Sequence, residues 1–438
     1  MPRKTTVAAH QHPYWHDQLG DVPDISEIPP ETVDVLIIGS GYTGLNAAIE
    51  TARGGRSTLI IDAANPGFGC STRNGGHIST SVKPSLAKLT AKFGERKAHA
   101  IRGEGRAALE WLGGFVSSEN LDCDFRRSGR YHAAHTPRHY EALVRDAETV
   151  RKQEGIESFA VPHSEQRSEL GSDVYFGGVV FTEYCSVHPA KLHRELLRIA
   201  LDAGAEVVGD CAALSIEKAG TGFKVATRKG VVSARDVVVA TNGYTAGLVP
   251  WIQRRVIPIG SYIIATEELP EALIDELFPT NRIACDTCKV IYYYRPSPDR
   301  RRIVFGGRVS ARETDTQAST PRLYDSMCRI FPQLEGCAIS HSWSGIVAYT
   351  FDELAHTGVH DGVHYALGYC GSGVSMAGYL GMRAGQKVLG LKEGATAFDD
   401  LPNPTRPFYT GSPWFLPGAV AYYRWIDDMQ CRRAAKAV

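Results

Sequence analysis

The stretch Asp34–Glu50, DVLIIGSGYTGLNAAIE, decides the fold of this chain. A run of apolar residues typical of a buried strand leads directly into Gly39, Gly41 and Gly44, and a helical segment follows. In the pattern G-x-G-x-x-G the first glycine allows a tight turn, the second lets the backbone approach a pyrophosphate, and the third lets helix and strand pack closely. The N–H groups at the helix start favour phosphate. The stretch therefore predicts a dinucleotide site.

A second strand, STLIIDA at 57–63, completes a β-α-β unit and carries Asp62, 23 residues after Gly39. At this spacing a carboxylate accepts hydrogen bonds from ribose hydroxyls, and it would repel the 2′-phosphate of NADP. The plain structural alternative is a glycine-rich turn in an unrelated α/β domain.

Composition limits the class of protein. The 438 residues predict two domains, and 48 Lys and Arg balance 48 Asp and Glu, which argues against a nucleic-acid or anionic-membrane partner. No apolar run reaches the roughly 20 residues of a membrane span, and the basic start lacks the apolar core of a signal peptide. Residues 1–30 read as an irregular arm, and RKTTVAAHQH near the start as a solvated tail. Ten scattered cysteines predict reduced thiols in a cytoplasmic protein.

We expect no metal site. The pair in CDTC (285–288) has zinc or redox spacing but stands without a second pair, which favours plain thiols. The three histidines of HAAHTPRH (132–139) are separated by Pro137, which interrupts a common helical face.

Two glycine-rich stretches favour FAD over NAD. PGFGCSTRNGGHIST (66–80) follows Asp62 directly, and such a long excursion suits a bulky cofactor whose far end the same chain must reach. GYCGSG (368–373) opens another helix, whose N-terminus would stabilise an anionic reduced flavin. The chain has no second G-x-G-x-x-G, which argues against flavin enzymes with a separate NADPH domain.

Motifs spread over the chain are together far more specific than the glycines alone. They are GSGYTGLNAA (39–48), GFGCSTRNGG (67–76), ATNGYT (240–245), GSYIIATEEL (260–269), RRIVFGGR (301–308), SWSG (342–345) and GYCGSGVSMAG (368–378). On these motifs the chain, from about residue 31 to 430, resembles the D-amino-acid oxidase/glycine oxidase superfamily of FAD enzymes. Within it, the likeness is greatest to gamma-glutamylputrescine oxidoreductases and related amine oxidases.

The resemblance implies a fold of class α/β plus α+β. A Rossmann-like FAD-binding domain would be interleaved with a mixed-sheet substrate domain, as in the glutathione-reductase type of FAD fold. The expected boundaries are an arm at 1–30, an FAD-binding domain at 31–94, 173–250 and 341–438, and a substrate domain at 95–172 and 251–340.

The resemblance also implies which residues hold FAD. The pyrophosphate would lie at Gly39, Gly41, Tyr42, Thr43 and Gly44, the ribose at Asp62 and Ala63, adenine at Ala213, the pyrophosphate and flavin along Ser71, Thr72, Arg73, Asn74, Gly75 and Gly76, and the pyrimidine end at Gly371, Ser372, Gly373 and Val374. Sarcosine oxidases attach the flavin to a cysteine where this chain has about Val347, so we expect FAD to be bound noncovalently.

The implied reaction is hydride removal from a C–H beside nitrogen, giving an imine that water hydrolyses. A desolvated aromatic pocket would hold the amine neutral and oriented. Alternation along IYYYRP (291–296) sends one tyrosine to the sheet face opposite its neighbours, and the stretch resembles one that places its second tyrosine in the substrate site of sarcosine oxidases. The catalytic candidates are His77, Tyr262, Tyr293, Arg308 and Trp343. Each candidate also has a purely structural interpretation. The aromatic residues could serve sheet packing, His77 could be a structural histidine, and Arg308 could be an exposed arginine at the end of a strand.

The substrate and electron acceptor stay open. The stretch SWSG has no arginine where amino-acid oxidases hold the substrate carboxylate, which weakens an α-amino-acid assignment. Secondary amines, gamma-glutamylated amines and cyclic imino acids such as L-pipecolate all fit. We favour O2 as acceptor, giving H2O2. The resemblance puts Val304 where sarcosine oxidases have a lysine, and Arg308 would supply the charge from a different position. An amine dehydrogenase with another acceptor is the alternative. Two other classes of protein stay open: an NAD-dependent dehydrogenase and a flavin-binding subunit with little turnover. The oligomeric state also stays open.

Overall fold

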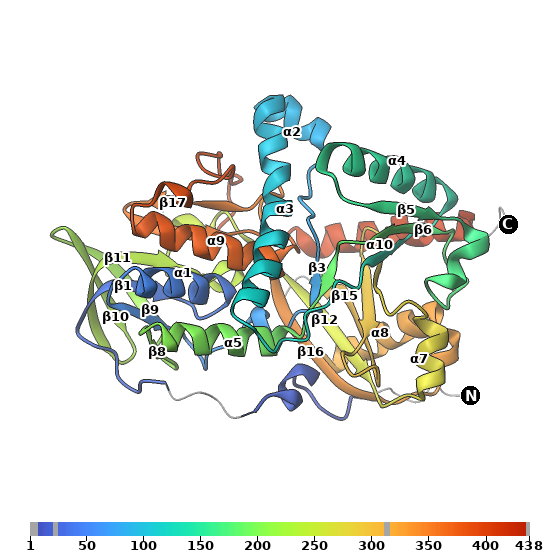
Figure 1. The fold of residues 1–438 in the computed structure, drawn as a ribbon, viewed down its shortest axis with the longest axis horizontal. Helices are drawn as coiled ribbons and strands as arrows, with labels where there is room; N and C mark the ends of the chain where they lie inside the picture. The colour runs from blue at the N-terminus through green and yellow to red at the C-terminus, as the bar shows by residue number, and fades with distance from the viewer. Residues whose placement is uncertain (1–7, 21–24, 311–315, 435–438) are drawn as a thin grey trace.

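The structure is a computed structural model that describes residues 8–20, 25–310 and 316–434, except for the side chains of 308–310. Two large sheets lie beside each other (Figure 1). The first sheet, with helices α1, α5 and α9, occupies the left of the view, and the second lies to the right with α7 and α8. The long helix α3 stands between the two halves. Over the described residues, none of the helices combines the length and apolar character needed to cross a membrane.

The first sheet is built around parallel strands. Its order is β17 (His356–His360), β18 (Val363–Leu367), β11 (Gly230–Val239), β1 (Thr32–Ile38), β2 (Thr58–Ile61) and β8 (Glu206–Val208), with β10 (Gly222–Thr227) joining β11 to β9 (Ala213–Ala219). β1 pairs in parallel with both β2 and β11, so it is a central strand. The predicted β-α-β unit is therefore confirmed.

From Val35 to Ile38, β1 is entirely apolar because both of its faces are covered. Val35 and Ile37 belong to one apolar cluster beneath the helices, whereas Leu36 and Ile38 belong to a second cluster on the opposite face. A central parallel strand buried on both faces carries an almost continuous apolar run rather than an alternating one. This packing holds the glycine turn at the end of β1 in a fixed place.

The helices have the following bounds: α1 Tyr42–Arg53, α2 Leu86–Phe93, α3 Glu95–Ser118, α4 Pro137–Glu154, α5 Pro189–Asp202, α6 Pro250–Gln253, α7 Glu271–Leu277, α8 Thr316–Ile330, α9 Gly373–Val388 and α10 Leu416–Ala434. α1 and α9 pack closely through small residues. A Cβ at Gly381 would lie 2.8 Å from Thr43 Cα, and one at Gly385 would lie 2.8 Å from the carbonyl oxygen of Ala47. The middle of α9 thereby lies against the first turns of α1.

The second sheet is mixed. Its order is β16 (Ile339–Tyr349), β12 (Ile257–Thr266), β15 (Ile303–Ser310), β14 (Tyr292–Pro296), β13 (Ile283–Asp286), β4 (Arg130–Ala133), β6 (Gly178–Phe181) and β5 (Ser158–Val161), while β3 (His77–Ile78) pairs with β7 (Cys185–Ser186) apart from it. Tyr292 and Tyr294 both stack on Phe305. Tyr293 belongs to a different apolar cluster, so the predicted alternation is confirmed.

Sheet membership cuts across the expected domain boundaries at two strands. β6 and most of β16 fall within segments assigned to the FAD-binding domain, yet both strands belong to the second sheet. α3, assigned to the substrate domain, contributes Ile101 and Leu109 to the core under the first sheet. The chain crosses between the halves more often than the motif spacing indicated; the domain boundaries themselves stay a prediction.

The N-terminal arm is not a solvated tail where the structure describes it, and this corrects the sequence interpretation. His10 N donates to Ser340 O at 2.8 Å, and Ser342 N donates to His10 O at 2.9 Å, so the arm continues the edge of the second sheet beside β16. The short 3-10 helix Tyr14–Gln18 (η1) follows, and its Trp15 is fully buried. Apolar burial and edge pairing together fix the arm.

Candidate functional site

A cavity of about 620 Å³ lies where the starts of α1 and α9 meet. This volume is in the range of small-molecule and cofactor sites, roughly 300–1,000 Å³. Its walls come from the turn after β1, the end of β2, the loop 63–74, the start of β9, the segment 240–248, the end of β16 and the start of α9. It therefore gathers most of the glycine-rich motifs into one elongated space.

The β1–α1 turn forms one end of the cavity wall as the motif predicts. Gly39 has a φ of +105°, a conformation open to glycine, and a Cβ on Gly41 would lie 2.9 Å from Ser71 Oγ. A Cβ on Gly44 would approach Ile37 of β1 to 3.2 Å and clash with the Gly39 carbonyl. The three glycines thus serve turn, close approach and helix packing, as expected. Gly41 gives α1 no side-chain cap of its own, and the N–H of Tyr42 donates to Ser71 Oγ at 3.0 Å. The helix dipole still favours an anion at this end.

Asp62 lies directly beside this turn. Its Oδ2 accepts from Ser40 N at 2.8 Å and from Ser40 Oγ at 2.6 Å, and its Oδ1 accepts from Ala64 N at 3.1 Å. The carboxylate therefore braces the turn and lines the cavity as well. Ala63 and Ala213 line the same end of the cavity.

The loop Cys70–Gly76 is held from behind by two tryptophans. Trp343 Nε1 donates to Arg73 O at 2.8 Å, and Trp15 Nε1 donates to Asn74 O at 2.9 Å. Arg73 in turn donates from Nη1 to Ser344 O at 3.2 Å, which joins the loop to β16. The carbonyl oxygens of Arg73 and Asn74 and the guanidinium of Arg73 therefore all have hydrogen-bond partners. These bonds fix the backbone of the loop along the cavity.

α9 brings a second helix start to the cavity. The Tyr369 hydroxyl, in the loop before it, lies 2.6 Å from Thr43 Oγ1 on α1. Ser372, the residue before the first turn, donates from Oγ to Ser81 O at 2.6 Å, and α9 has no side-chain cap. Two helix N-termini therefore border one cavity, and both favour negative charge there.

Most of the residues predicted to hold the cofactor line this cavity: Gly39, Gly41, Tyr42, Thr43, Asp62, Ala63, Ser71, Asn74, Ala213, Gly371, Gly373 and Val374. The others lie behind its wall. Gly44 packs on β1, Thr72 Oγ1 lies 2.9 Å from His16 Nε2, and Ser372 bonds the segment near Ser81. Direct contact with the cofactor stays a prediction for every one of them.

His77 and Tyr293 lie together next to the cavity loop. Their rings meet edge to face with centroids 5.6 Å apart, and a Cβ on Gly75 would lie 2.9 Å from the Tyr293 ring. The Tyr293 hydroxyl lies 2.9 Å from Ser261 Oγ. His77 Nε2 is buried without a hydrogen-bond partner in the described part of the chain. Burial, with the charges of Arg295 and Arg130, holds the pKa of His77 well below its usual value, so its imidazole is neutral.

The other catalytic candidates lie elsewhere. Tyr262 is fully buried in the apolar cluster of the second sheet, and Trp343 is fully buried against Trp15, with ring centroids 6.3 Å apart. Neither lines the cavity, and neither do His77 and Tyr293, which lie beside the loop that does. Arg308 belongs to β15, but its side chain lies outside the described residues. Contact of these three side chains with a substrate stays a prediction.

Two cations near the site were not singled out from the sequence. The positive charge of Lys83 acts on Cys370, which lines the cavity, and on His132 of β4. Arg130 Nε is buried and has no hydrogen-bond partner among the residues described, and its guanidinium lies 4.5 Å from the Tyr184 ring centroid. Neither residue belongs to a motif, so only the tertiary packing identifies them.

All ten cysteines are free thiols. Cys370 borders the cavity, and burial raises its pKa to about 11, which keeps the thiol protonated. In CDTC, Cys288 neighbours Cys431, with His135 and Asp427 also close by. Asp427 accepts from the backbone N–H groups of Lys289 and Val290, both at 2.9 Å, so its oxygens already have partners.

Comparisons with known proteins agree with this geometry. The family model of FAD-dependent oxidoreductases called DAO matches residues 34–386. The probable oxidoreductase OrdL of Rhizobium meliloti (strain 1021) is 33% identical over 407 residues, which cover 90% of this chain and 92% of the relative. Gamma-glutamylputrescine oxidoreductase of Escherichia coli (strain K12) is 29% identical, with coverages of 91% and 93%.

The fold recurs in a solved structure. Glycine oxidase from Geobacillus kaustophilus superposes with a TM-score of 0.72 at 19% identity, covering 86% of this chain and 99% of that one. The predicted fold class, a Rossmann-like domain with a mixed-sheet partner, is confirmed, and so is the resemblance drawn from the motifs.

Proposed function

Because the chain belongs to the DAO family of FAD-dependent oxidoreductases, we propose that it oxidises the C–N bond of a secondary or gamma-glutamylated amine to an imine. FAD is the cofactor, and when bound it supplies the chemistry of hydride acceptance from the carbon beside the nitrogen. Water then hydrolyses the imine to a carbonyl compound and the released amine. The protein's own task is to bind FAD and to present a neutral amine to it.

The residues present fit FAD. The cavity is lined by Asp62 and Ala213, where the resemblance puts the adenosine, and by Gly371 and Val374, where it puts the flavin. Gly41 leaves open the space that a side chain would fill against Ser71. The starts of α1 and α9 offer N–H groups to the pyrophosphate and to the flavin end.

The observation that carries the proposal is the unpartnered Nε2 of the neutral His77. A buried imidazole nitrogen without a partner costs free energy unless a ligand satisfies it. The N–H of an amine would do so. The cations Arg295 and Arg130 that lower the pKa of His77 also disfavour an ammonium at this place. The site thus selects the neutral amine, whose nitrogen lone pair must be free for hydride loss from the adjacent carbon.

We further propose that Arg130 binds a carboxylate on the substrate. Its Nε has no partner within the described residues, and a guanidinium pairs with carboxylates in two parallel hydrogen bonds. A gamma-glutamylated amine carries such a carboxylate at a distance from the oxidised nitrogen. Arg130→Met should therefore raise the KM for carboxylated amines and leave that for uncharged amines unchanged.

For the acceptor, we propose O2, with H2O2 as product. Lys83 places a positive charge near the α9 end of the cavity, and a cation there stabilises developing negative charge during reoxidation. An amine dehydrogenase with a different acceptor is the alternative. The ten free thiols support a reducing compartment such as the cytoplasm.

An anaerobic titration tests the proposal. The protein with its bound flavin is mixed with secondary, gamma-glutamylated and cyclic amines between pH 6 and about 9, and flavin bleaching is recorded. We expect bleaching that becomes faster with pH until the free amine predominates. Admission of air should then release H2O2. If none of these amines bleaches the flavin while a nicotinamide coenzyme does, the proposal fails.

A further inference from the structure

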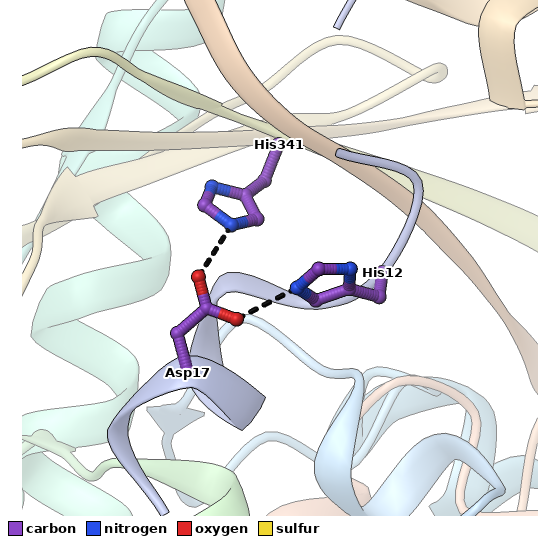
Figure 2. A group of neighbouring side chains, drawn as sticks. All are labelled: His12, Asp17 and His341. Atoms are coloured by element: carbon purple, nitrogen blue, oxygen red, sulfur yellow. Dashed lines mark hydrogen bonds and ion pairs between the residues drawn. The ribbon is translucent and has the colours of Figure 1, made fainter. Parts of the chain in front are cut away.

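Four ionisable side chains meet where the N-terminal arm joins β16, away from the cavity. His12 and Asp17 come from the arm and η1, and His341 comes from β16 (Figure 2). His12 Nε2 lies 2.6 Å from Asp17 Oδ1, and His341 Nε2 lies 2.8 Å from Asp17 Oδ2. The His10 ring lies beside them, with its centroid 4.8 Å from that of His341. One ligand atom each from His12, Asp17 and His341 fits within 4.8 Å.

The hydrogen bonds around Ser340 determine which nitrogen of His341 carries a proton. Ser340 Oγ lies 2.6 Å from Thr266 O and 3.2 Å from Ala265 O, and carbonyl oxygens only accept. The single hydroxyl hydrogen is therefore directed to these carbonyls. His341 Nδ1, 2.9 Å from the same Oγ, must then donate to it. In a neutral imidazole this leaves Nε2 without a hydrogen.

The bare Nε2 of His341 faces a carboxylate oxygen of Asp17, so two acceptors confront each other at 2.8 Å. Such a contact is repulsive unless a cation lies between them or the imidazole is protonated. His341 is only 3% exposed, so little water reaches its side of the contact. A bound metal cation removes the conflict without charging the imidazole.

We propose that His12, Asp17 and His341 bind one divalent transition-metal ion such as Zn2+. Two imidazole nitrogens and a carboxylate are common ligands of this ion, and a fourth position stays open to water or His10. The Nδ1–H of His341 donating to Ser340 is the second-layer hydrogen bond that metal-bound histidines make. This assigns a metal site although the sequence motifs predicted none, and it is independent of the proposed function.

The geometry requires only a small adjustment. Ligand atoms around a tetrahedral Zn2+ lie about 3.3 Å apart, given bonds of about 2.0–2.1 Å. The two contacts with Asp17, at 2.6 and 2.8 Å, would each lengthen by about half an ångström or slightly more. The side chains of His12 and Asp17 are 46% and 45% exposed, so both can rotate to allow this. His341 is fixed by Ser340 and the sheet, and it provides the preorganised ligand.

The ion would fasten the arm to the cavity loop. Asp17 belongs to the same short helix as Trp15 and His16, which contact Asn74 and Thr72 of the loop Cys70–Gly76. His341 belongs to the strand that carries Trp343, which contacts Arg73. A bond through the metal joins the two supports of that loop.

Zinc titration of the full chain tests the site. The tag-free protein with its flavin is freed of metal with a chelator, and Zn2+ alone is titrated by calorimetry. We expect one ion per chain, and at least about tenfold weaker binding in His12→Ala and in Asp17→Ala, both exposed positions that leave the core intact. Ser340→Ala keeps all three ligands and should weaken binding roughly 10–100-fold through loss of the second-layer hydrogen bond.

The matched control is His99→Ala, an exposed histidine on α3 remote in sequence from the cluster, which should bind as the parent does. Co2+ in place of Zn2+ should give the visible absorption of a four-coordinate site in the parent and not in Asp17→Ala. The proposal is overturned if the parent binds no ion, or if His12→Ala and Asp17→Ala keep the affinity of the parent. In the second case the ion sits elsewhere, for instance near His135 and Cys288.

Discussion

Trp343 on β16 donates a hydrogen bond from Nε1 to the backbone carbonyl of Arg73, at a distance of 2.8 Å. The bond joins the strand that bears the SWSG motif to the loop along the cavity. The glycine of the same motif, Gly345, also approaches this loop, since a Cβ there would lie 2.9 Å from Cys70 Sγ. The motif therefore supports the cofactor loop from behind, and Trp343 acts as a positioning residue.

We predict that Trp343→Phe weakens FAD binding and lowers the free energy of unfolding by about 1–3 kcal/mol, because the buried Arg73 carbonyl loses its donor. Phe keeps an aromatic ring but lacks the second ring of the indole, so some packing is lost together with the hydrogen bond. Urea unfolding and FAD titration of the apoprotein measure the two effects. Trp425→Phe is the control, since Trp425 is 59% exposed on α10. Equal losses in both variants would remove the hydrogen bond as the cause.

Asp62→Ala should weaken FAD by roughly 1–3 kcal/mol, because a charged acceptor beside the β1–α1 turn is lost together with its bonds to Ser40. Titration of the apoprotein with FAD measures this change. Asp34→Ala is a matched control: its carboxylate also holds a backbone N–H and a hydroxyl, those of Ser57, but at the opposite end of β1. If Asp62→Ala binds FAD with the affinity of the parent, Asp62 does not contribute to FAD binding.

FAD should be released in full when the protein is denatured by acid. Val347 lines the cavity at the position of the attaching cysteine, and the neighbouring thiol of Cys370 is kept protonated by a pKa of about 11, so Cys370 offers no thiolate to the flavin. Absorbance of the supernatant after precipitation measures the released flavin. Yellow colour retained in the washed precipitate would contradict noncovalent binding.

Reoxidation by O2 should depend on a nearby cation. We expect Lys83→Met to slow the reaction of the reduced enzyme with O2 by at least roughly tenfold, a barrier increase of about 1.4 kcal/mol, because its charge acts on the α9 end of the cavity. Stopped-flow mixing measures the rate, and Lys88→Met, an exposed lysine on α2, is the control.

The same experiment on Arg308→Met tests the residue selected from the sequence. If that variant reoxidises as fast as the parent, Arg308 has no part in oxygen activation. If the parent itself reoxidises much more slowly than it turns over with an artificial acceptor, the enzyme is a dehydrogenase rather than an oxidase.

Stability should fall in mild acid. Burial lowers the pKa of His188 and of His193 from the usual 6.5 to about 4, so the unfolded chain binds these protons before the folded one does. The stability held by the neutral rings is complete above pH 6.5 and is lost as the pH falls toward 4, by up to about 1.4 kcal/mol per pH unit for each histidine.

Urea unfolding at a series of pH values checks this slope. His193→Gln should lower it by the contribution of one histidine, because glutamine does not titrate and can still donate to Ser40 O, which His193 Nε2 contacts at 2.8 Å. A slope that is the same in parent and variant would mean that His193 is not the titrating group.

Local chain chemistry was enough to predict much of the fold and of the cofactor site. The glycine turn after β1 and the opposite faces of Tyr293 and its neighbours follow from the conformational range of glycine and the period of a strand. These rules act within a few residues. The wider set of motifs gave the family and FAD because together they fill one cavity.

Only the tertiary structure decided which distant residues meet. Asp17 and His341 are 324 positions apart, and Trp15 reaches Asn74 because the arm pairs with the edge of β16, a contact that no local period signals. Lys83 and Arg130 likewise became candidates only because their charges act on histidines that belong to other segments of the chain. Sequence periodicity determines which face of an element is buried, but the partner across that face is set by the packing of the whole chain, since burial is nondirectional.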